Sequence, residues 1–183
     1  VDPVITFGLR EKLRAFGGSS TKSDYPLIKR GSILIPTGGT TGGIKLAVHN
    51  WASLQAAVLG LQSYLGVVAI NSACQLPLYH VSGLMQLVRS FITGGSIHFD
   101  GSVEEGDCLS LVPTQLQRAL NSSDEISKFR KARAIFVGGS RISESTALRA
   151  SELRLPLMPV YGMTETAAMV AAVPSKDFLQ NYK

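Results

Sequence analysis

The sequence is poor in the residues that build metal centres and disulfide frameworks. Its 183 residues include two cysteines, three histidines and one tryptophan. Cys74 and Cys108 stand in apolar surroundings without a CxxC pattern, so we expect buried free thiols in a reducing compartment, the cytoplasm. The histidines at 49, 80 and 98 are too dispersed for a zinc motif.

Long apolar runs and concentrated charge are also missing. No stretch is long enough to span a membrane, and residues 1–16 carry charges where a signal peptide needs an apolar core. The net charge of +5 comes from scattered Lys and Arg. The one basic cluster, 128–133, is more typical of a solvated helix face than of a nucleic-acid site, and a mild positive excess suits an anionic ligand. We therefore expect small-molecule partners, with no nucleic acid and no membrane span.

What is present is a chain that can bury a core. Hydrophobic residues make up 45% of the sequence, with a mean hydropathy of +0.18, which is enough for one domain or a large part of one. Short strand-like runs alternate with segments such as 51–66, where apolar residues recur every three or four positions. This alternation predicts an α/β fold, a sheet buried on both faces and flanked by helices.

The expected elements follow from these periods. Ser82, Thr114 and Ser143 are the expected N-caps of three helices. We expect strands within 32–36, 45–49, 73–78, 107–112, 133–139 and 155–162, and helices within 51–66, 81–95, 113–120, 140–153 and 163–173.

In such sheets ligands bind where loops leave the strand ends, and the first polar loop, 37–45, has the composition of a phosphate cradle. Glycines let backbone N–H groups curl around an anion, Thr hydroxyls add donors, and Lys45 adds a positive charge. A Walker A loop is excluded because no hydroxyl residue follows Lys45, and GxGxxG is absent. The alternative is a Gly-rich hairpin between two strands.

Two further polar loops follow strand-like runs. Paired glycines in 138–141 would let a flat ligand lie against the backbone, although a turn before a helix capped at Ser143 has the same composition. Loop 161–166 offers a carboxylate beside hydroxyls, which suits Mg²⁺ on a nucleotide, or else it is a polar turn. It combines an aromatic ring, a glycine, two hydroxyls and the carboxylate in Tyr161, Gly162, Thr164, Thr166 and Glu165.

Four segments resemble, in order and rough spacing, the core motifs of the acyl-adenylate-forming superfamily, which includes acyl-CoA synthetases, firefly luciferase and nonribosomal adenylation domains. These segments are PTGGTTGGIK, LPLYHVSGL, FVGGSRIS and PVYGMTET, and the resemblance covers residues 33–173. The run LPLYHVSGLMQLVRSFITGG, with LVPTQLQRAL after it, is most similar to 2-succinylbenzoate:CoA ligases of menaquinone and phylloquinone biosynthesis, particularly the cyanobacterial form.

The resemblance implies that residues 1–183 are part of the large N-terminal domain of an acyl-CoA synthetase. It further implies an AMP-forming ligase that uses ATP, Mg²⁺ and CoA to activate a carboxylic acid. The sequence ends before the family's ribose-binding Asp and the C-terminal domain with its adenylation Lys. We therefore expect this stretch alone to be inactive, and to self-associate as a homo-oligomer through surface that the missing segments would cover.

The resemblance also assigns roles. Lys45, His80, Thr164 and Glu165 would be catalytic, with Thr164 on the α-phosphate, Glu165 on Mg²⁺ and His80 beside the acyl tunnel. Gly138, Gly139 and Ser140 would border the adenine and acyl groups, and Tyr161, next to Gly162, would stack on adenine. The β- and γ-phosphates would be gripped by Thr37, Gly38, Gly39, Thr40, Thr41, Gly42 and Lys45.

The acyl pocket would include His80, Ser82, Gly83, Gly138 and Arg89. 2-Succinylbenzoate has two carboxylates, one of which reacts, so a cation or several donors should hold the other, and Arg89 is a candidate. The alternatives are a surface arginine at position 89, a core histidine at position 80 and a core aromatic at position 161.

Two departures from the family pattern bear on the phosphate loop. Gly38 replaces the usual Ser and Ile44 the usual Pro, which removes one hydroxyl and loosens the loop. Two other functions stay open: another acyl- or aryl-CoA synthetase or carrier-loading adenylation enzyme, and a nucleotide-binding module without turnover.

Overall fold

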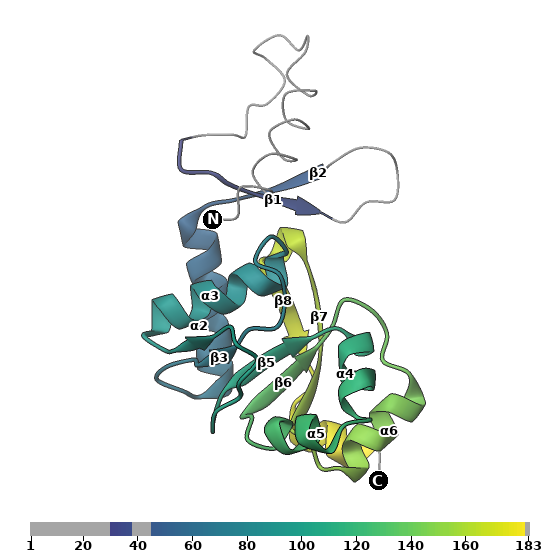
Figure 1. Cartoon of the computed structure of the whole chain (residues 1–183). Helices are drawn as coiled ribbons and strands as arrows, with labels where there is room; N and C mark the ends of the chain where they lie inside the picture. The colour runs from purple at the N-terminus through teal and green to yellow at the C-terminus, as the bar shows by residue number, and fades with distance from the viewer. Residues whose placement is uncertain (1–29, 38–44, 182–183) are drawn as a thin grey trace.

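A six-stranded sheet organises the part of the chain that the computed structural model describes, residues 30–37 and 45–181 (Figure 1). The strand order is β4-β3-β5-β6-β7-β8, in which the first five strands are parallel and the edge strand β8 is antiparallel to β7. The strands are β3 (Ser72–Ala73), β4 (Ile97–His98), β5 (Cys108–Leu111), β6 (Ala134–Val137), β7 (Leu157–Met163) and β8 (Ala168–Ala172).

Helices cover both faces of this sheet. Successive strand residues point to opposite faces, so Ile135 packs in the core formed with α4 to α7, whereas Phe136 packs in the core on the α2 side. This arrangement confirms the predicted α/β sheet buried on both faces. The helices are α2 (Trp51–Leu65), α3 (Val81–Thr93), α4 (Pro113–Ala119), α5 (Ser123–Phe129), α6 (Glu144–Glu152) and α7 (Ser175–Asn181).

A separate hairpin lies at one end of the sheet (Figure 1). Its strands β1 (Ile33–Thr37) and β2 (Lys45–His49) pair antiparallel, with Ile33 opposite His49 and Thr37 opposite Lys45. It contacts the short 3₁₀ turn η1 (Thr164–Thr166) that joins β7 to β8. The two strands of the predicted hairpin, and their antiparallel pairing, are therefore confirmed.

Of the three predicted N-caps, the one at Ser143 was correct, and α5, which Ser122 caps, was not predicted. Ser143 caps α6, because its Oγ accepts from the Thr146 N–H at 3.2 Å. Ser82 and Thr114 lie inside α3 and α4, so the prediction that they are N-caps was wrong. Pro113 occupies the first helical position of α4, where its fixed φ and missing N–H fit.

Two of the expected elements were also wrong. The run 73–78 contributes only Ala73 to β3 before the chain turns towards α3. The run 163–173 is the turn η1 followed by strand β8, not a helix. A short apolar run fits either element by period alone, and here pairing with the exposed edge of β7 decides for a strand.

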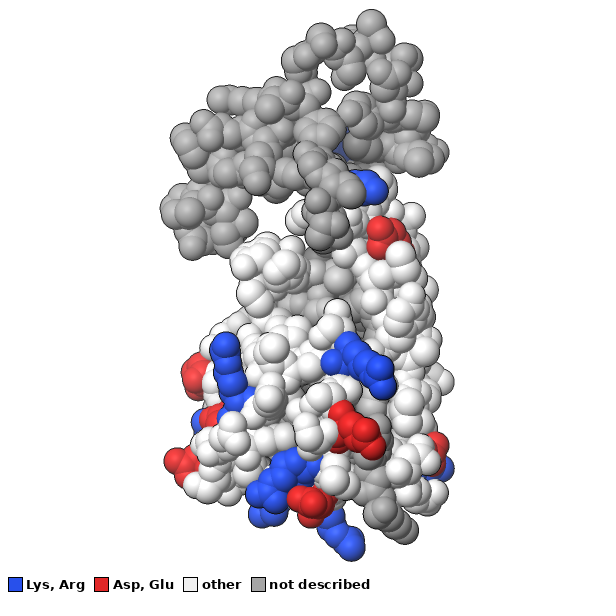
Figure 2. All heavy atoms as spheres, turned by 90° about the vertical axis from the view of Figure 1, so that its right-hand side faces the viewer, with Lys and Arg blue, Asp and Glu red and all other residues white. Residues whose placement is uncertain are grey.

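The surface carries no concentrated charge on the face shown in Figure 2, where basic and acidic side chains are interspersed. The ion pairs found, Lys128–Glu125 at 2.8 Å and Arg149–Glu152 at 3.2 Å, each join neighbours on one helix. Within the two described ranges, no helix is both long and apolar enough to cross a membrane.

Two helical glycines give opposite predictions for the same substitution. A Cβ at Gly60 in α2 would meet nothing, whereas one at Gly83 in α3 would collide with the Pro77 carbonyl. Gly60→Ala should therefore raise the free energy of unfolding by up to about 1 kcal/mol through helix propensity. Gly83→Ala should lower it by about 1–3 kcal/mol through overpacking. Urea denaturation measures both, and equal stability of the two variants would show that α3 does not need this close approach.

Candidate functional site

A pocket opens at the carboxyl ends of the parallel strands β5, β6 and β7, with α3 and β8 forming its other walls. This is the expected ligand position in a parallel sheet. The pocket unites predicted residues from three distant segments. Those that line it are Ser82, Arg89, Gly138, Gly139 and Gly162.

Arg89 places a positive charge in the wall of this pocket. Its side chain is buried, with 2% exposed, so the alternative of a surface arginine is wrong. Its Nε donates to the Met85 carbonyl at 3.0 Å, and its guanidinium carbon lies 5.6 Å from the centroid of the Phe136 ring. Burial lowers the pKa of Arg89 to about 10, so the guanidinium remains charged at neutral pH.

Two buried polar atoms at the pocket lack a partner in the described part of the chain. They are Nη1 of Arg89 and Oγ of Ser110. A buried donor without an acceptor is costly, and native structures leave few of them. Each atom would be satisfied by an oxygen acceptor of a ligand in this pocket. The sequence reasoning missed Ser110, although a lone hydroxyl in the apolar strand 108–111 was the available signal.

The glycines at the pocket are required by close backbone approach. A Cβ at Gly138 would lie 2.8 Å from Cγ2 of Val160, and one at Gly162 would collide with the Ala168 carbonyl. Gly139 has φ +85°, a conformation that side chains disfavour. Ser140, next in the chain, is exposed. Gly138 is thus required by its packing on Val160 of β7, and Gly139 by its backbone conformation.

The turn η1 presents the predicted metal-binding carboxylate. Thr166 holds the turn, because its Oγ1 accepts from the Met163 N–H at 3.0 Å and lies 2.8 Å from the Ala168 carbonyl. Ala167 and Ala168 have φ of 53° and 78°, which non-glycine residues rarely adopt and which store strain. Glu165 is exposed at the apex of the turn.

The residues around Glu165 fit Mg²⁺ better than a metal held by protein alone. Among the described residues, no group of three His, Cys, Asp or Glu side chains could hold a metal ion. Mg²⁺ on a nucleotide needs only one or two carboxylates besides phosphate oxygens and water. A single exposed carboxylate beside the Thr164 backbone meets that need.

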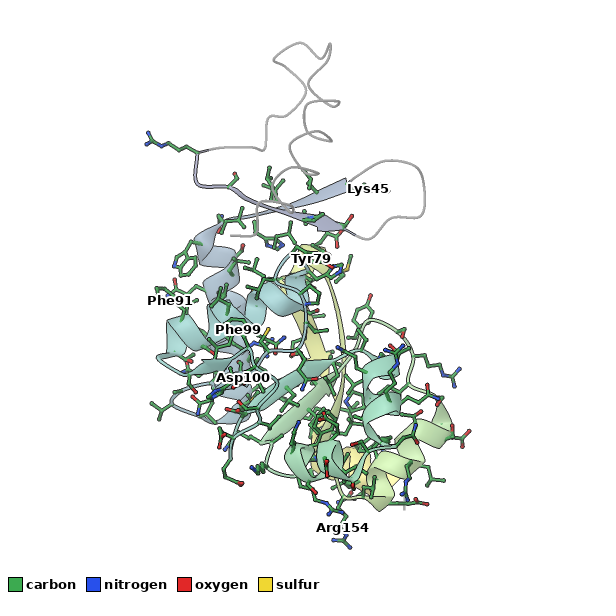
Figure 3. The ribbon with its side chains drawn as sticks, viewed as in Figure 1. Lys45, Tyr79, Phe91, Phe99, Asp100 and Arg154 are labelled. Atoms are coloured by element: carbon green, nitrogen blue, oxygen red, sulfur yellow. The ribbon has the colours of Figure 1, made fainter. Side chains whose placement is uncertain are left out.

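The hairpin brings the predicted phosphate residues to the same end of the sheet. Figure 3 shows Lys45 at the end of the hairpin, and the register places it opposite Thr37. Because side chains alternate along a strand, Lys45, Ala47 and His49 share one face of β2, the face that buries Ala47 and His49. The predicted residues Gly38, Gly39, Thr40, Thr41 and Gly42 lie outside the described residues.

Besides Ser140 and the predicted residues of the hairpin and the turn η1, three further predicted residues lie outside the pocket lining. His80 is the exposed N-cap residue of α3, with its ring centroid 4.6 Å from that of Tyr79, so the alternative of a core histidine is wrong. Tyr161 is 67% exposed, so it is not a core aromatic. Gly83 packs against the Pro77 backbone. Their functional roles stay predictions.

Relatives of this chain include several curated 2-succinylbenzoate–CoA ligases. The chain is 30% identical over 153 residues to 2-succinylbenzoate–CoA ligase of Enterococcus faecalis, covering 77% of this chain and 32% of that protein. It is 34% identical over 146 residues to the Haemophilus influenzae 2-succinylbenzoate–CoA ligase, covering 76% and 32%. The chain thus spans about a third of the length of the curated relatives it matches.

A solved structure agrees in fold. O-Succinylbenzoate coenzyme A synthetase of Bacillus subtilis, in complex with ATP and magnesium ion, superposes with a TM-score of 0.67 at 25% identity, over 78% of this chain and 32% of that chain. The family described as AMP-binding enzyme matches residues 29–182. The chain therefore belongs to the AMP-binding enzyme family, as its motifs predicted.

Proposed function

We propose that this chain is part of an AMP-forming 2-succinylbenzoate:CoA ligase of menaquinone or phylloquinone biosynthesis, acting in the cytoplasm. The observation that carries the proposal is the buried, charged Arg89 with an unpartnered nitrogen at a pocket on the carboxyl edge of the sheet. The similarity to 2-succinylbenzoate–CoA ligases supports the same acid.

The acyl end of the site follows from the two carboxylates of this acid. One carboxylate must reach the nucleotide, and the other needs a partner that replaces its hydration. Arg89 offers its Nη1 and Ser110 its Oγ, both buried and both without a partner in the described ranges. A charge-assisted bond from each would satisfy both atoms. Gly138 lines the same pocket as Arg89 and Ser110, and the aromatic ring would lie there between the two ends.

The nucleotide end draws on the turn η1 and the hairpin. We assign Thr164 to the α-phosphate, Thr37 and Lys45 to the β- and γ-phosphates, and Tyr161, which is exposed, to stacking on adenine. Glu165 would hold Mg²⁺, which neutralises phosphate charge when bound. Lys45 and Thr164 then contribute donors that stabilise negative charge as it shifts to the leaving pyrophosphate.

The reaction we propose has two steps. A carboxylate oxygen of the acid attacks the α-phosphorus of ATP, the bond to the bridging oxygen breaks, and pyrophosphate leaves with the electron pair. The sulfur of CoA then attacks the carbonyl of the mixed anhydride, its proton passes to water, the bond from the carbonyl carbon to the phosphate oxygen breaks, and AMP leaves with the electron pair. This chain contributes the binding and orientation of the acid and the phosphates in the first step.

The acid-dependent exchange of pyrophosphate into ATP tests the function on the full-length protein. We expect 2-succinylbenzoate to support exchange at least about a hundredfold faster than benzoate or hexanoate, because a site with buried polar groups rejects acids that leave them unpaired. Equal exchange with benzoate would favour another acyl- or aryl-CoA synthetase. No exchange with any acid would favour a nucleotide-binding module.

Arg89→Met tests the acyl assignment separately from folding. Loss of the charge should raise the KM for 2-succinylbenzoate about a hundredfold, since the free carboxylate then remains buried and unpaired. The free energy of unfolding should not fall, because a buried charge without a carboxylate partner is itself costly. The matched control is Arg118→Met, an exposed arginine on α4. An unchanged KM in Arg89→Met would remove Arg89 from the site.

Glu165→Gln tests the metal assignment. Calorimetric titration with ATP, with and without Mg²⁺, should show that Mg²⁺ strengthens binding to the wild type by about tenfold more than to the variant, because the amide lacks the charge that attracts the ion. Glu105→Gln, which changes an exposed carboxylate away from the turn, is the control. An equal effect of Mg²⁺ on wild type and Glu165→Gln would contradict the assignment.

A further inference from the structure

His49, the last residue of β2, joins the hairpin to the turn η1. Its ring is buried, with 7% exposed, and its Nε2 lies 2.7 Å from the carbonyl oxygen of Thr164. A carbonyl oxygen can only accept, so Nε2 carries the hydrogen and donates it. The bond connects two segments that are 115 positions apart in the sequence.

The accepting carbonyl belongs to the strained part of the turn. The same Thr164 oxygen accepts from the Ala167 N–H at 3.2 Å, and Ala167 has φ 53°. On the other side of the imidazole, Nδ1 lies 3.3 Å from Oγ of Ser53, in the first turn of α2. The ring, which β2 carries, therefore contacts both the turn η1 and the start of α2.

The hydrogen bond from His49 to Thr164 restricts the position of the hairpin on the turn more than the apolar contacts do. Among residues 33–37, 45–49 and 164–166, it is the one side-chain hydrogen bond between hairpin and turn. The remaining packing, such as that of Ile33 on the cluster with Ala167 and Ala168, is apolar. Apolar burial is non-directional, so it permits sliding that a short hydrogen bond to a fixed carbonyl resists.

We infer that His49 is a positioning residue that fixes the hairpin on the turn η1, so that Lys45 and Thr164 reach the same polyphosphate. Lys45 and His49 share a face of one short strand, and the register carries the constraint to Thr37 opposite Lys45. An ångström of misplacement between such groups can cost about a hundredfold in effectiveness. The positioning role rests on the proposed binding of ATP by these residues. The hydrogen bond from His49 to the Thr164 carbonyl, here called the tether, does not depend on it.

The experiment uses the full-length protein and two readouts. Hydrogen exchange without nucleotide follows the amides of 164–168 and 45–48, with α5 and α6 as internal reporters of global folding. Calorimetry then compares the dissociation constants of ATP·Mg²⁺ and AMP. The variants are His49→Ala, which removes the donor, and His49→Gln, whose side-chain amide places an N–H near the position of Nε2. His98→Ala, a half-buried histidine on β4, is the control.

We expect His49→Ala to speed exchange at 164–168 about tenfold while α5 and α6 stay protected. It should weaken ATP·Mg²⁺ about tenfold and AMP less than threefold, because AMP lacks the phosphates that Lys45 would bind. His49→Gln should recover most of both effects, and His98→Ala should show neither.

Three results would overturn the inference. Unchanged exchange at 164–168 in His49→Ala would remove the tether. Faster exchange with an unchanged ratio of ATP·Mg²⁺ to AMP affinity would show that the tether does not position the phosphate groups. A wild type that binds no ATP·Mg²⁺ would end the proposed function and with it the positioning role, while exchange would still decide whether the bond holds the turn.

Discussion

The guanidinium of Arg89 lies between α3 and the sheet, where it bonds to the Met85 carbonyl and faces the Phe136 ring. One of its nitrogens is buried without a partner in the described part of the chain. Such burial costs several kcal/mol unless an anion or a full set of acceptors compensates. This charge lies at the carboxyl edge of the sheet, where we propose that the free carboxylate of the substrate binds. Ser110, Gly138 and Gly139 line the same pocket as this charge.

The residues that we propose to bind the nucleotide depend on a different constraint, the sharp reversal of the chain between β7 and β8. Thr166 bonds within this reversal, Ala167 and Ala168 accept left-handed φ values, and Gly162 leaves room for the Ala168 carbonyl. Strain of about 1–3 kcal/mol for each such residue persists only where the surroundings hold it. The apolar cluster beneath the turn and the His49 hydrogen bond provide that support. The exposed Glu165 is thereby presented on a rigid backbone.

Local sequence signals predicted the elements where a single local cause decided them. The helical period predicted α2 almost to the residue, and a hydroxyl that caps predicted the start of α6 at Ser143. Local signals failed where partners distant in sequence decided. The run 163–173 became a turn and a strand because β7 offered an edge to pair with, and Ser82 was absorbed into a helix that begins one residue earlier.

The sequence by itself determined the α/β class, the three polar loops and the family, because periodicity, turn chemistry and motif order are properties of neighbouring residues. Only the tertiary structure decided that Arg89 is buried and charged, that Ser110 joins it, and that His49 bonds to Thr164. These facts depend on which side chains from distant segments meet, and on how much water the packing excludes around them. A residue type does not fix its own burial. Arginine is mostly exposed in proteins, and only the packing of the folded chain removes water from around Arg89.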